Sequence, residues 1–216
     1  MFSPKTFLIS AAFFLCAMVH AQDFGFSGSW FTVMPVGDTS HVGAQPGFRV
    51  EGTIWNSDFG FPRLCTQSIT YGQTFPVTIE KVAYLHNNLP STGKINFSTR
   101  SFGVRYTTEA AQPTKHLAVH IGLGLYMTSI LYTFKPEGVL SPGDYATDFL
   151  GHEYSYGNPS QKTFSGMFEL TAGVSYEFRP FNIFVNAGFY RGLFSEMPFQ
   201  NSIDLAAGIF VPVWRR

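Results

Sequence analysis

Two histidines and two glutamates are the residues of this sequence best suited to acid–base chemistry. His116 and His120 lie four residues apart in a segment of alternating polarity, and Glu169 and Glu177 lie on the polar face of a later segment. An imidazole beside a carboxylate can act as a general acid–base pair or bind a metal ion. The spacing therefore permits a catalytic or metal-binding interpretation.

A structural role is the interpretation that we prefer for these residues. Other charged side chains fall on the same polar face, and charges that are removed from water need partners. We therefore predict no catalytic residue, no metal site and no cofactor. The predicted internal hydrogen-bonded network comprises Arg49, Glu51, His116, His120, Glu169, Glu177 and Asp204.

A second group of residues, rich in acids and aromatics, lies in a long segment between Phe134 and Gln161. Loosely spaced carboxylates can bind a divalent cation, but their spacing here matches no defined calcium loop. We prefer a solvated loop near a membrane surface that recognises a partner protein or a glycan, because loops on a rigid scaffold often carry function. Its residues are Asp144, Tyr145, Asp148, His152, Glu153, Tyr154 and Tyr156.

The elements that would position these residues are β-strands. From His116 to Tyr132 the odd positions are apolar except Ser129, and the even positions up to Thr128 are mostly small or polar. A period of two indicates a strand with two different faces. Similar patterns predict strands over Phe24–Val36, Gly47–Trp55, Ser68–His86, Lys94–Thr107, Phe164–Phe178, Phe181–Leu193 and Ile203–Val213. The alternation is lost partway in Ser68–His86 and Lys94–Thr107, and a change of phase between Ile79 and Val82 indicates a bulge.

Composition indicates that these strands cross a membrane. Charged residues make up 13% of the chain, against about 25% in an ordinary soluble domain. Aromatic residues make up 17%, with 24 Phe, and the formal charge of zero gives no indication of nucleic-acid binding. Only helices and closed sheets satisfy every backbone group in hydrocarbon. We therefore predict an all-β fold, an eight-stranded antiparallel up-and-down transmembrane β-barrel.

The placement of charge indicates which face of each strand meets lipid. The predicted network residues lie on the face that carries Gly, Ala, Ser, Thr and Asn, whereas the exterior of a soluble barrel would be rich in Lys and Glu. Small residues suit the narrow interior of an eight-stranded barrel. Arg191 has the apolar parity, but it lies near the outer end of its strand, where a charge costs about 0–1 kcal/mol. The apolar face is therefore predicted to face outward.

The lengths of the connections fit one orientation of this barrel. The longest connection falls on the extracellular side, as outer-membrane barrels prefer. The turns expected in the periplasm are Asn56–Leu64, Thr108–Thr114 and Arg179–Pro180. The connections expected outside are Gly37–Val42, Asn87–Gly93, Phe134–Gln161 and Ser195–Asn201.

The N-terminal segment predicts export. Lys5 precedes an apolar run from Phe7 to Val19 that is too short to cross a bilayer as a helix, and we expect cleavage of a signal peptide, residues 1–21, after Ala21. Residues 22–216 then form the barrel domain. Only Cys65 remains after cleavage, so no disulfide within the chain is expected.

The pattern resembles the small eight-stranded outer-membrane β-barrel family, OmpA-like and OmpX-like, in the form widespread in Bacteroidetes. Residues 120–126 (HIGLGLY), 170–176 (LTAGVSY) and 205–213 (LAAGIFVPV) carry the resemblance. It implies the outer membrane of a Gram-negative bacterium, with lipid and lipopolysaccharide as surroundings and assembly by the barrel-assembly machinery. The chain departs from the family where Trp214 is followed by Arg215 and Arg216 instead of ending on an aromatic residue.

The function that we expect is a structural or surface-interaction role through the outer loops, without enzyme activity. A general pore is not expected, because that needs about 16 strands. Three alternatives stay open: an accessory protein of secretion or envelope assembly, a lipid A-modifying enzyme, and a soluble lipocalin-like barrel. Loss of secreted proteins on deletion, a changed lipid A mass, and solubility without detergent would indicate them in turn.

Overall fold

The computed structural model describes residues 23–36, 43–56, 65–86, 89–136, 142–148, 153–155, 160–178, 180–193 and 201–215. The strands are β1 Asp23–Pro35, β2 Gln45–Asn56, β3 Cys65–Thr74, β4 Val77–His86, β5 Leu89–Ala111, β6 Leu117–Pro136, β7 Tyr145–Asp148, β8 Glu153–Ser155, β9 Ser160–Phe178, β10 Phe181–Gly192 and β11 Asn201–Arg215. Within these ranges no helix is long and apolar enough to cross a membrane.

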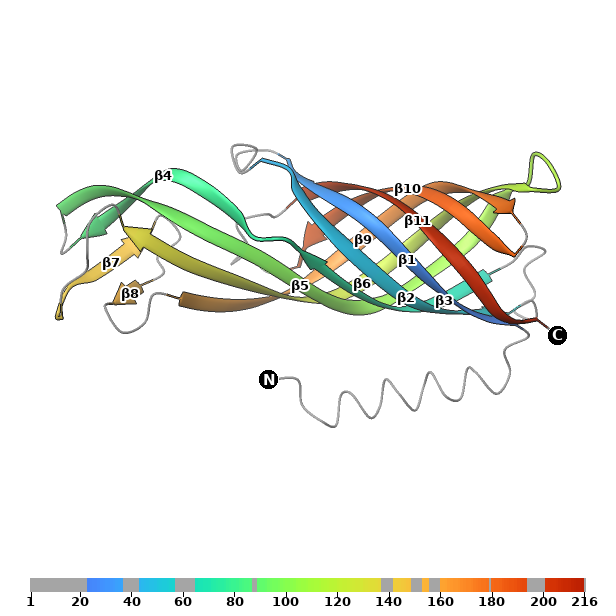
Figure 1. Ribbon diagram of the computed structural model, residues 1–216, viewed down its shortest axis with the longest axis horizontal. Coiled ribbons are helices and arrows are strands. Elements are labelled where there is room, and N and C mark those ends of the chain that lie inside the picture. The colour runs from blue at the N-terminus through green and yellow to red at the C-terminus, as the bar shows by residue number, and fades with distance from the viewer. Residues whose placement is uncertain are drawn as a thin grey trace.

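Eight of these strands close into a barrel, because β3 pairs with both β2 and β5. The order around the barrel is β1, β2, β3, β5, β6, β9, β10 and β11, and β11 pairs back with β1 (Figure 1). Every neighbouring pair is antiparallel. The predicted eight-stranded antiparallel barrel is therefore confirmed.

The tilt of the strands follows from the register. A row of cross-strand partners leaves β6 at Val119 and returns to β6 at Ser129, ten residues closer to the end where β5 and β6 project. The row runs through Val119, Val174, Val185, Ala207, Trp30, Phe48, Gln73, Arg100 and Ser129. A stagger of this size over eight strands tilts them by about 40° from the barrel axis.

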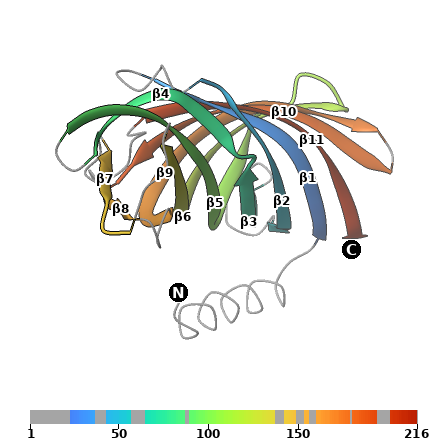
Figure 2. The same ribbon diagram turned by 60° about the vertical axis from the view of Figure 1, so that its left-hand side comes forward.

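The barrel strands β5, β6 and β9 continue well beyond the barrel, and together with β4, β7 and β8 they form a second unit, which we call the arm. It comprises β4, β7, β8 and the adjoining residues 89–99 of β5, 130–136 of β6 and 160–166 of β9 (Figure 1). In Figure 2 the arm comes forward, and β7 and β8 extend its sheet from β4 round toward β9. The Gln161 side chain donates a hydrogen bond of 2.6 Å to the Glu153 carbonyl across that gap.

The arm has an apolar core of its own. Side chains from β4, β5 and β6, together with Tyr154 of β8 and Ala146 of β7, are almost completely buried. The Phe134 ring lies 4.7 Å from that of Tyr84 and 5.0 Å from that of Tyr154. The core consists of Tyr84, Ile95, Phe97, Ile130, Tyr132, Phe134, Ala146 and Tyr154.

Three sequence predictions are wrong at the arm. Ser68–His86 is two strands, because Phe75 and Pro76 separate β3 from β4, although the predicted bulge between Ile79 and Val82 is confirmed. The expected loop Asn87–Gly93 is largely strand, because β5 begins at Leu89. The expected loop Phe134–Gln161 contains β7, β8 and the start of β9. The strand predicted over Lys94–Thr107 is confirmed, and β5 extends it at both ends, to Leu89 and Ala111.

The remaining connections are partly described. Phe178 pairs with Phe181, as the predicted tight turn at Arg179–Pro180 requires, and Arg179 itself lies outside the described residues. The turn expected at Thr108–Thr114 begins later, because β5 runs to Ala111. The expected signal peptide, the connection Gly37–Val42 and nearly all of Asn56–Leu64 and Ser195–Asn201 lie outside the described residues.

Candidate functional site

A buried polar cluster, which we call the plug, crosses the middle of the barrel. Arg49 of β2 donates from Nη2 to Tyr190 and, at 3.0 Å, to Asp204 of β11, and its Nη1 lies 3.6 Å from Glu169 of β9. Glu169 is fully buried and accepts hydrogen bonds from the hydroxyls of Tyr126 and Tyr190, the latter at 2.7 Å. Side chains of β9, β10 and β11 therefore converge on the one cation, Arg49, and Tyr126 of β6 joins them through Glu169.

A second ion pair belongs to the same plug. Nη2 of Arg105, on β5, donates to both carboxylate oxygens of Glu51 at 2.5 Å, and the Ser27 hydroxyl donates to Glu51 at 3.3 Å. Both side chains of the pair are buried. Removing one member of a buried ion pair leaves an uncompensated charge, which is strongly destabilising. The plug is thus a set of mutually dependent side chains.

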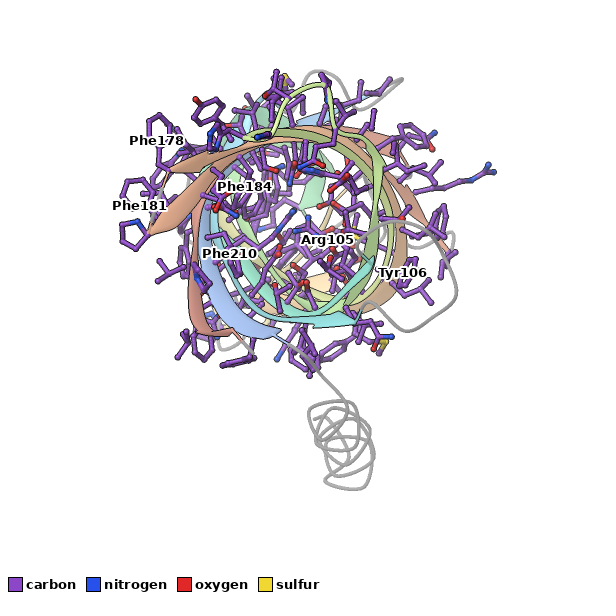
Figure 3. All side chains as sticks on the ribbon, turned by 90° about the vertical axis from the view of Figure 1, so that its right-hand side faces the viewer. Arg105, Tyr106, Phe178, Phe181, Phe184 and Phe210 are labelled. Carbon is purple, nitrogen blue, oxygen red and sulfur yellow. The ribbon has the colours of Figure 1, made fainter. Side chains whose placement is uncertain are left out.

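The plug divides the interior into two unequal spaces. On the side of the turns lies a cavity of about 410 Å³, lined by residues that include Arg105, His120, Phe184 and Phe210. Figure 3 looks into this end of the barrel and shows Arg105, Phe184 and Phe210 inside the ring of strands, with Phe178 and Phe181 outside. On the side of the arm lies a second cavity, of about 50 Å³.

Glycines make room for the plug. A Cβ atom added at Gly124 would lie 2.6 Å from Glu169, and one added at Gly188 would collide with Asp204. At Gly173 an added Cβ would collide with Asn186, the partner of His120. The small residues of the interior face therefore lie where large polar side chains of neighbouring strands cross the lumen.

The predicted network residues fall into two groups. Arg49, Glu51, Glu169 and Asp204 are brought together in the plug. The other three lie toward the turns: His116 is exposed with Nδ1 4.0 Å from Glu177, and Nε2 of His120 lies 2.9 Å from the amide oxygen of Asn186. His120 thus contacts an amide and not Glu169. Within the part of the chain that the structure describes, no three His, Cys, Asp or Glu side chains gather as a metal site.

The residues predicted for the long loop are dispersed over the arm. Asp144 lies 3.2 Å from Nε2 of His86, and Tyr145 of β7 and Glu153 of β8 are exposed. Tyr154, which we expected at an interaction surface, is buried in the arm core at 1% exposure. Asp148 is the last residue of β7 and pairs with Tyr84, whereas His152 and Tyr156 lie outside the described residues.

Sequence reasoning missed three members of the plug. Arg105 lies on the strand whose alternation could not be followed, so its inward direction was not apparent. Tyr126 and Tyr190 lie on the predicted inward faces, but their hydroxyl groups were not considered as partners for the charges. A buried tyrosine hydroxyl usually has a hydrogen-bond partner, so tyrosines on a polar inward face were the available signal.

Comparison with known proteins adds a likeness of overall shape. No protein-family model and no curated protein sequence matches the chain. One similar solved structure is the N-terminal β-barrel domain of Pseudomonas aeruginosa OprF, at 12% identity and a TM-score of 0.46, with 89% of this chain and 98% of that chain covered. Another is Ail, the attachment invasion locus protein of Yersinia pestis, solved with the heparin analogue sucrose octasulfate. It shows 12% identity and a TM-score of 0.45, with 88% of this chain and 96% of that chain covered. The barrel architecture itself is established by the strand pairing of this chain.

Proposed function

We propose that the protein is an integral outer-membrane barrel that displays a rigid arm at the cell surface, where the arm contacts partner molecules. The observation that carries this proposal is the reversed polarity of the barrel, apolar outside and charged inside. Large apolar side chains are 40–60% exposed around its wall, far more than a water-soluble monomer usually presents in one contiguous surface. They include Phe26, Trp30, Val50, Val104, Leu123, Leu170, Val185, Leu205 and Val211.

Aromatic residues near both ends of the apolar wall support a membrane-spanning position. Phe178 and Phe181 are exposed at the hairpin of the turn end, with their rings 6.2 Å apart. Toward the arm end, Trp30 lies 5.2 Å from Phe75, which lies 6.3 Å from Phe48. Barrels that span the outer membrane carry aromatic girdles at both interfaces.

The plug supports an anchoring role over a channel role. Arg49 contacts both Glu169 and Asp204 across the lumen, two tyrosines bond to these carboxylates, and the cavity beside them on the arm side is about 50 Å³. An eight-stranded barrel leaves an interior that side chains can fill. A soluble barrel that binds an apolar ligand would need the opposite arrangement, with its apolar face inside.

The arm is the part of the molecule best suited to meet a partner. It extends past the ends of the other five barrel strands, and its own core holds its shape. Its outward side chains include Thr92, Lys94, Lys135, Tyr145 and Glu153, which are exposed. Rigid presentation of polar surface suits recognition of a protein or a glycan.

Cysteine labelling in intact cells tests both the membrane position and the orientation. In a Cys65→Ser background, Thr92→Cys places a thiol on the arm and Thr114→Cys places one in the turn at the opposite end, both at exposed positions. A membrane-impermeant maleimide should label the arm thiol in intact cells and the turn thiol only after permeabilisation. The protein should also fractionate with outer membranes, and its unboiled band should migrate faster than the boiled one.

Two outcomes would contradict the proposal. A soluble periplasmic product without a heat-dependent shift would remove the membrane-spanning barrel. Labelling of Thr114→Cys in intact cells, with Thr92→Cys protected, would place the arm in the periplasm and would exclude a role at the cell surface.

A further inference from the structure

The cavity on the turn side of the plug is large enough to hold a small molecule. Its inner end is lined by Glu51 and Arg105, and its outer end by the exposed residues Gln112 and Lys115 of the turn between β5 and β6. Its volume of about 410 Å³ lies within the range of about 300–1,000 Å³ that small-molecule sites occupy. The cavity therefore extends from the exposed end of the barrel to the plug.

One wall of this cavity alternates amide groups with an aromatic ring. Asn182, Phe184 and Asn186 are successive inward residues of β10, and Figure 3 shows Phe184 and Phe210 inside the ring of strands. A Cβ atom added at Gly208, the β11 partner of Phe184, would lie 2.6 Å from the Phe184 ring. The Phe184 ring therefore extends along the wall, over a glycine, instead of crossing the lumen.

The opposite wall carries hydroxyl groups. β3 lies across the barrel from β10, because three strands separate the two on either side. Thr66 and Ser68 of β3 line the cavity together with Thr53 of β2 and Thr107 of β5. The hydroxyls of Thr53 and Ser68 lie 3.0 Å apart, and Thr66 donates a hydrogen bond to the Thr107 carbonyl. A hydroxyl that donates one hydrogen bond can still accept another, so this wall suits a ligand that carries hydroxyl groups.

Two polar side chains of the lining have hydrogen-bonding capacity that the described residues leave unused. Nη2 of Arg105 donates to both carboxylate oxygens of Glu51, but no described residue accepts a hydrogen bond from its Nε or Nη1. Likewise, Oδ1 of Asn182 accepts no hydrogen bond from the described part of the chain. Buried donors and acceptors without partners are costly. The lining therefore has both donors and an acceptor to satisfy.

The register separates these two side chains along the barrel axis. Arg105, Gly124, Glu169 and Tyr190 form one row of cross-strand partners, and this row climbs toward the arm from β5 to β10. A stagger of ten residues over eight strands raises the row by about one and a quarter residues per strand, so Tyr190 lies about four residues higher than Arg105. Asn182 precedes Tyr190 by eight residues on β10. The backbone of Arg105 is therefore about four residues, or about 10 Å, further from the mouth than that of Asn182.

Charge within the cavity opposes a simple ion as its occupant. Of the described residues that line it, Glu51, Glu109 and Glu177 are acidic, and Arg105 and Lys115 are basic. An anion at Arg105 would also meet the Glu51 carboxylate, which is already paired with that guanidinium. A cation held by Glu51 would meet the same guanidinium. A neutral molecule that both donates and accepts hydrogen bonds avoids either conflict.

We infer that this cavity binds a neutral saccharide, with two linked rings spanning its depth. A sugar ring has a face of C–H groups, which pack against the Phe184 ring, and hydroxyls at its rim, which donate and accept hydrogen bonds. Sugar oxygens accept from Arg105 at the inner end, and a hydroxyl of the second ring donates to Asn182 nearer the mouth. The inference rests on the proposed function only for the compartment, because the mouth faces the periplasm when the arm lies at the cell surface.

Binding of defined sugars to the purified full chain tests this inference. The barrel is held in a detergent without a sugar headgroup, and saturation-transfer NMR measures its affinity for glucose and for three neutral disaccharides with different linkages: maltose, cellobiose and chitobiose. At least one disaccharide should bind, and more tightly than glucose, because two rings can reach both Arg105 and Asn182. Inorganic phosphate, added as a competitor, should not displace it.

Two substitutions and a matched control locate the binding in the cavity. Phe184→Leu removes the ring and Asn182→Ala removes the acceptor, and each should weaken disaccharide binding by about five-fold, which corresponds to about 1 kcal/mol. Phe181→Leu removes an exposed ring from the outward face of the same strand and should leave the affinity unchanged. Arg105 is kept in all three variants, because the plug depends on it. The heat-dependent shift on a gel shows that each variant is folded.

Three results would overturn the inference. The first is a folded wild-type barrel that binds none of the three disaccharides, which would leave water as the occupant. The second is displacement of the sugar by phosphate, which would assign the cavity to an anion. The third is an unchanged affinity in both Phe184→Leu and Asn182→Ala. Any of these results, with cysteine labelling and the heat-dependent shift intact, would leave the proposed membrane position standing.

Discussion

The two ends of β6 show opposite polarity on an unbroken strand. In the barrel its outward residues, such as Leu123 and Met127, are apolar, and its inward Tyr126 and Thr128 are polar partners of other strands. In the arm its inward residues Ile130, Tyr132 and Phe134 are part of an apolar core. Its outward residue Lys135, near the end of the strand, is charged and exposed. The pattern inverts at Thr128–Ile130 while the period of two continues.

The proposed membrane position explains the inversion as a change of solvent along the strand. Where lipid surrounds the wall, outward side chains are apolar and charges are placed inside, where they pair with one another. Where water surrounds the sheet, apolar side chains gain by burial, as in an ordinary soluble domain. The same hydrogen-bonded ladder of β5, β6 and β9 serves both regions. If the barrel spans a membrane as proposed, the position of the inversion marks the membrane boundary on this side of the barrel.

Of the substitutions proposed here, removal of the central cation of the plug should lower the free energy of unfolding the most. Arg49→Met leaves Glu169 and Asp204 without their shared partner while retaining most of the side-chain volume. Loss of one member of a buried charged cluster should lower the free energy of unfolding by about 3–5 kcal/mol. Urea unfolding in lipid vesicles, followed by tryptophan fluorescence, measures this. Lys115→Met, at an exposed turn position, is the control and should change it by less than about 0.5 kcal/mol.

An arginine introduced on the outward face should distinguish the barrel from the arm directly. Leu123 and Leu131 lie on the same face of β6 and are 50% and 43% exposed. Leu123→Arg should lower the free energy of unfolding by about 2–4 kcal/mol, as expected near the middle of the bilayer. Leu131→Arg should change it by less than about 0.5 kcal/mol, because this position meets water. Equal costs at the two sites in the same vesicle assay would show that the boundary does not lie between them.

This inversion also explains how far the sequence could predict the fold. The barrel was predictable because alternation of apolar and small polar residues persists through most of its strands, as in β9 and β10. The arm was not predictable from this alternation, because the apolar side chains of β5 and β6 change from the outward face to the inward face along each strand. On β5 the inward series changes from Arg105 and Gly103 to Phe97 and Ile95, which appears in the sequence as lost alternation.

For the plug, the sequence could predict which charged residues point inward but not how they pair. Arg49, Glu51, Glu169 and Asp204 could be placed inside the barrel because charge stands out on a face of small residues. Their pairing could not be predicted, because it depends on the stagger of strands that are distant in sequence, such as β2 and β11. Tyr154 was misjudged for a different reason. An aromatic residue among acids suggests an exposed loop, yet β8 buries this ring against Phe134.

A substitution in the arm core should lower the free energy of unfolding the least. It tests whether the arm opens independently of the barrel. Ile130 is fully buried just beyond the inversion, and Ile130→Val removes one methylene group, which should cost about 0.5–1.5 kcal/mol. Hydrogen exchange should become faster in β4, β7 and β8, which pair only within the arm. Exchange in β1, β10 and β11 should stay unchanged, because the plug and the closed ladder hold them. Faster exchange throughout the barrel would show that the two regions unfold as one cooperative unit.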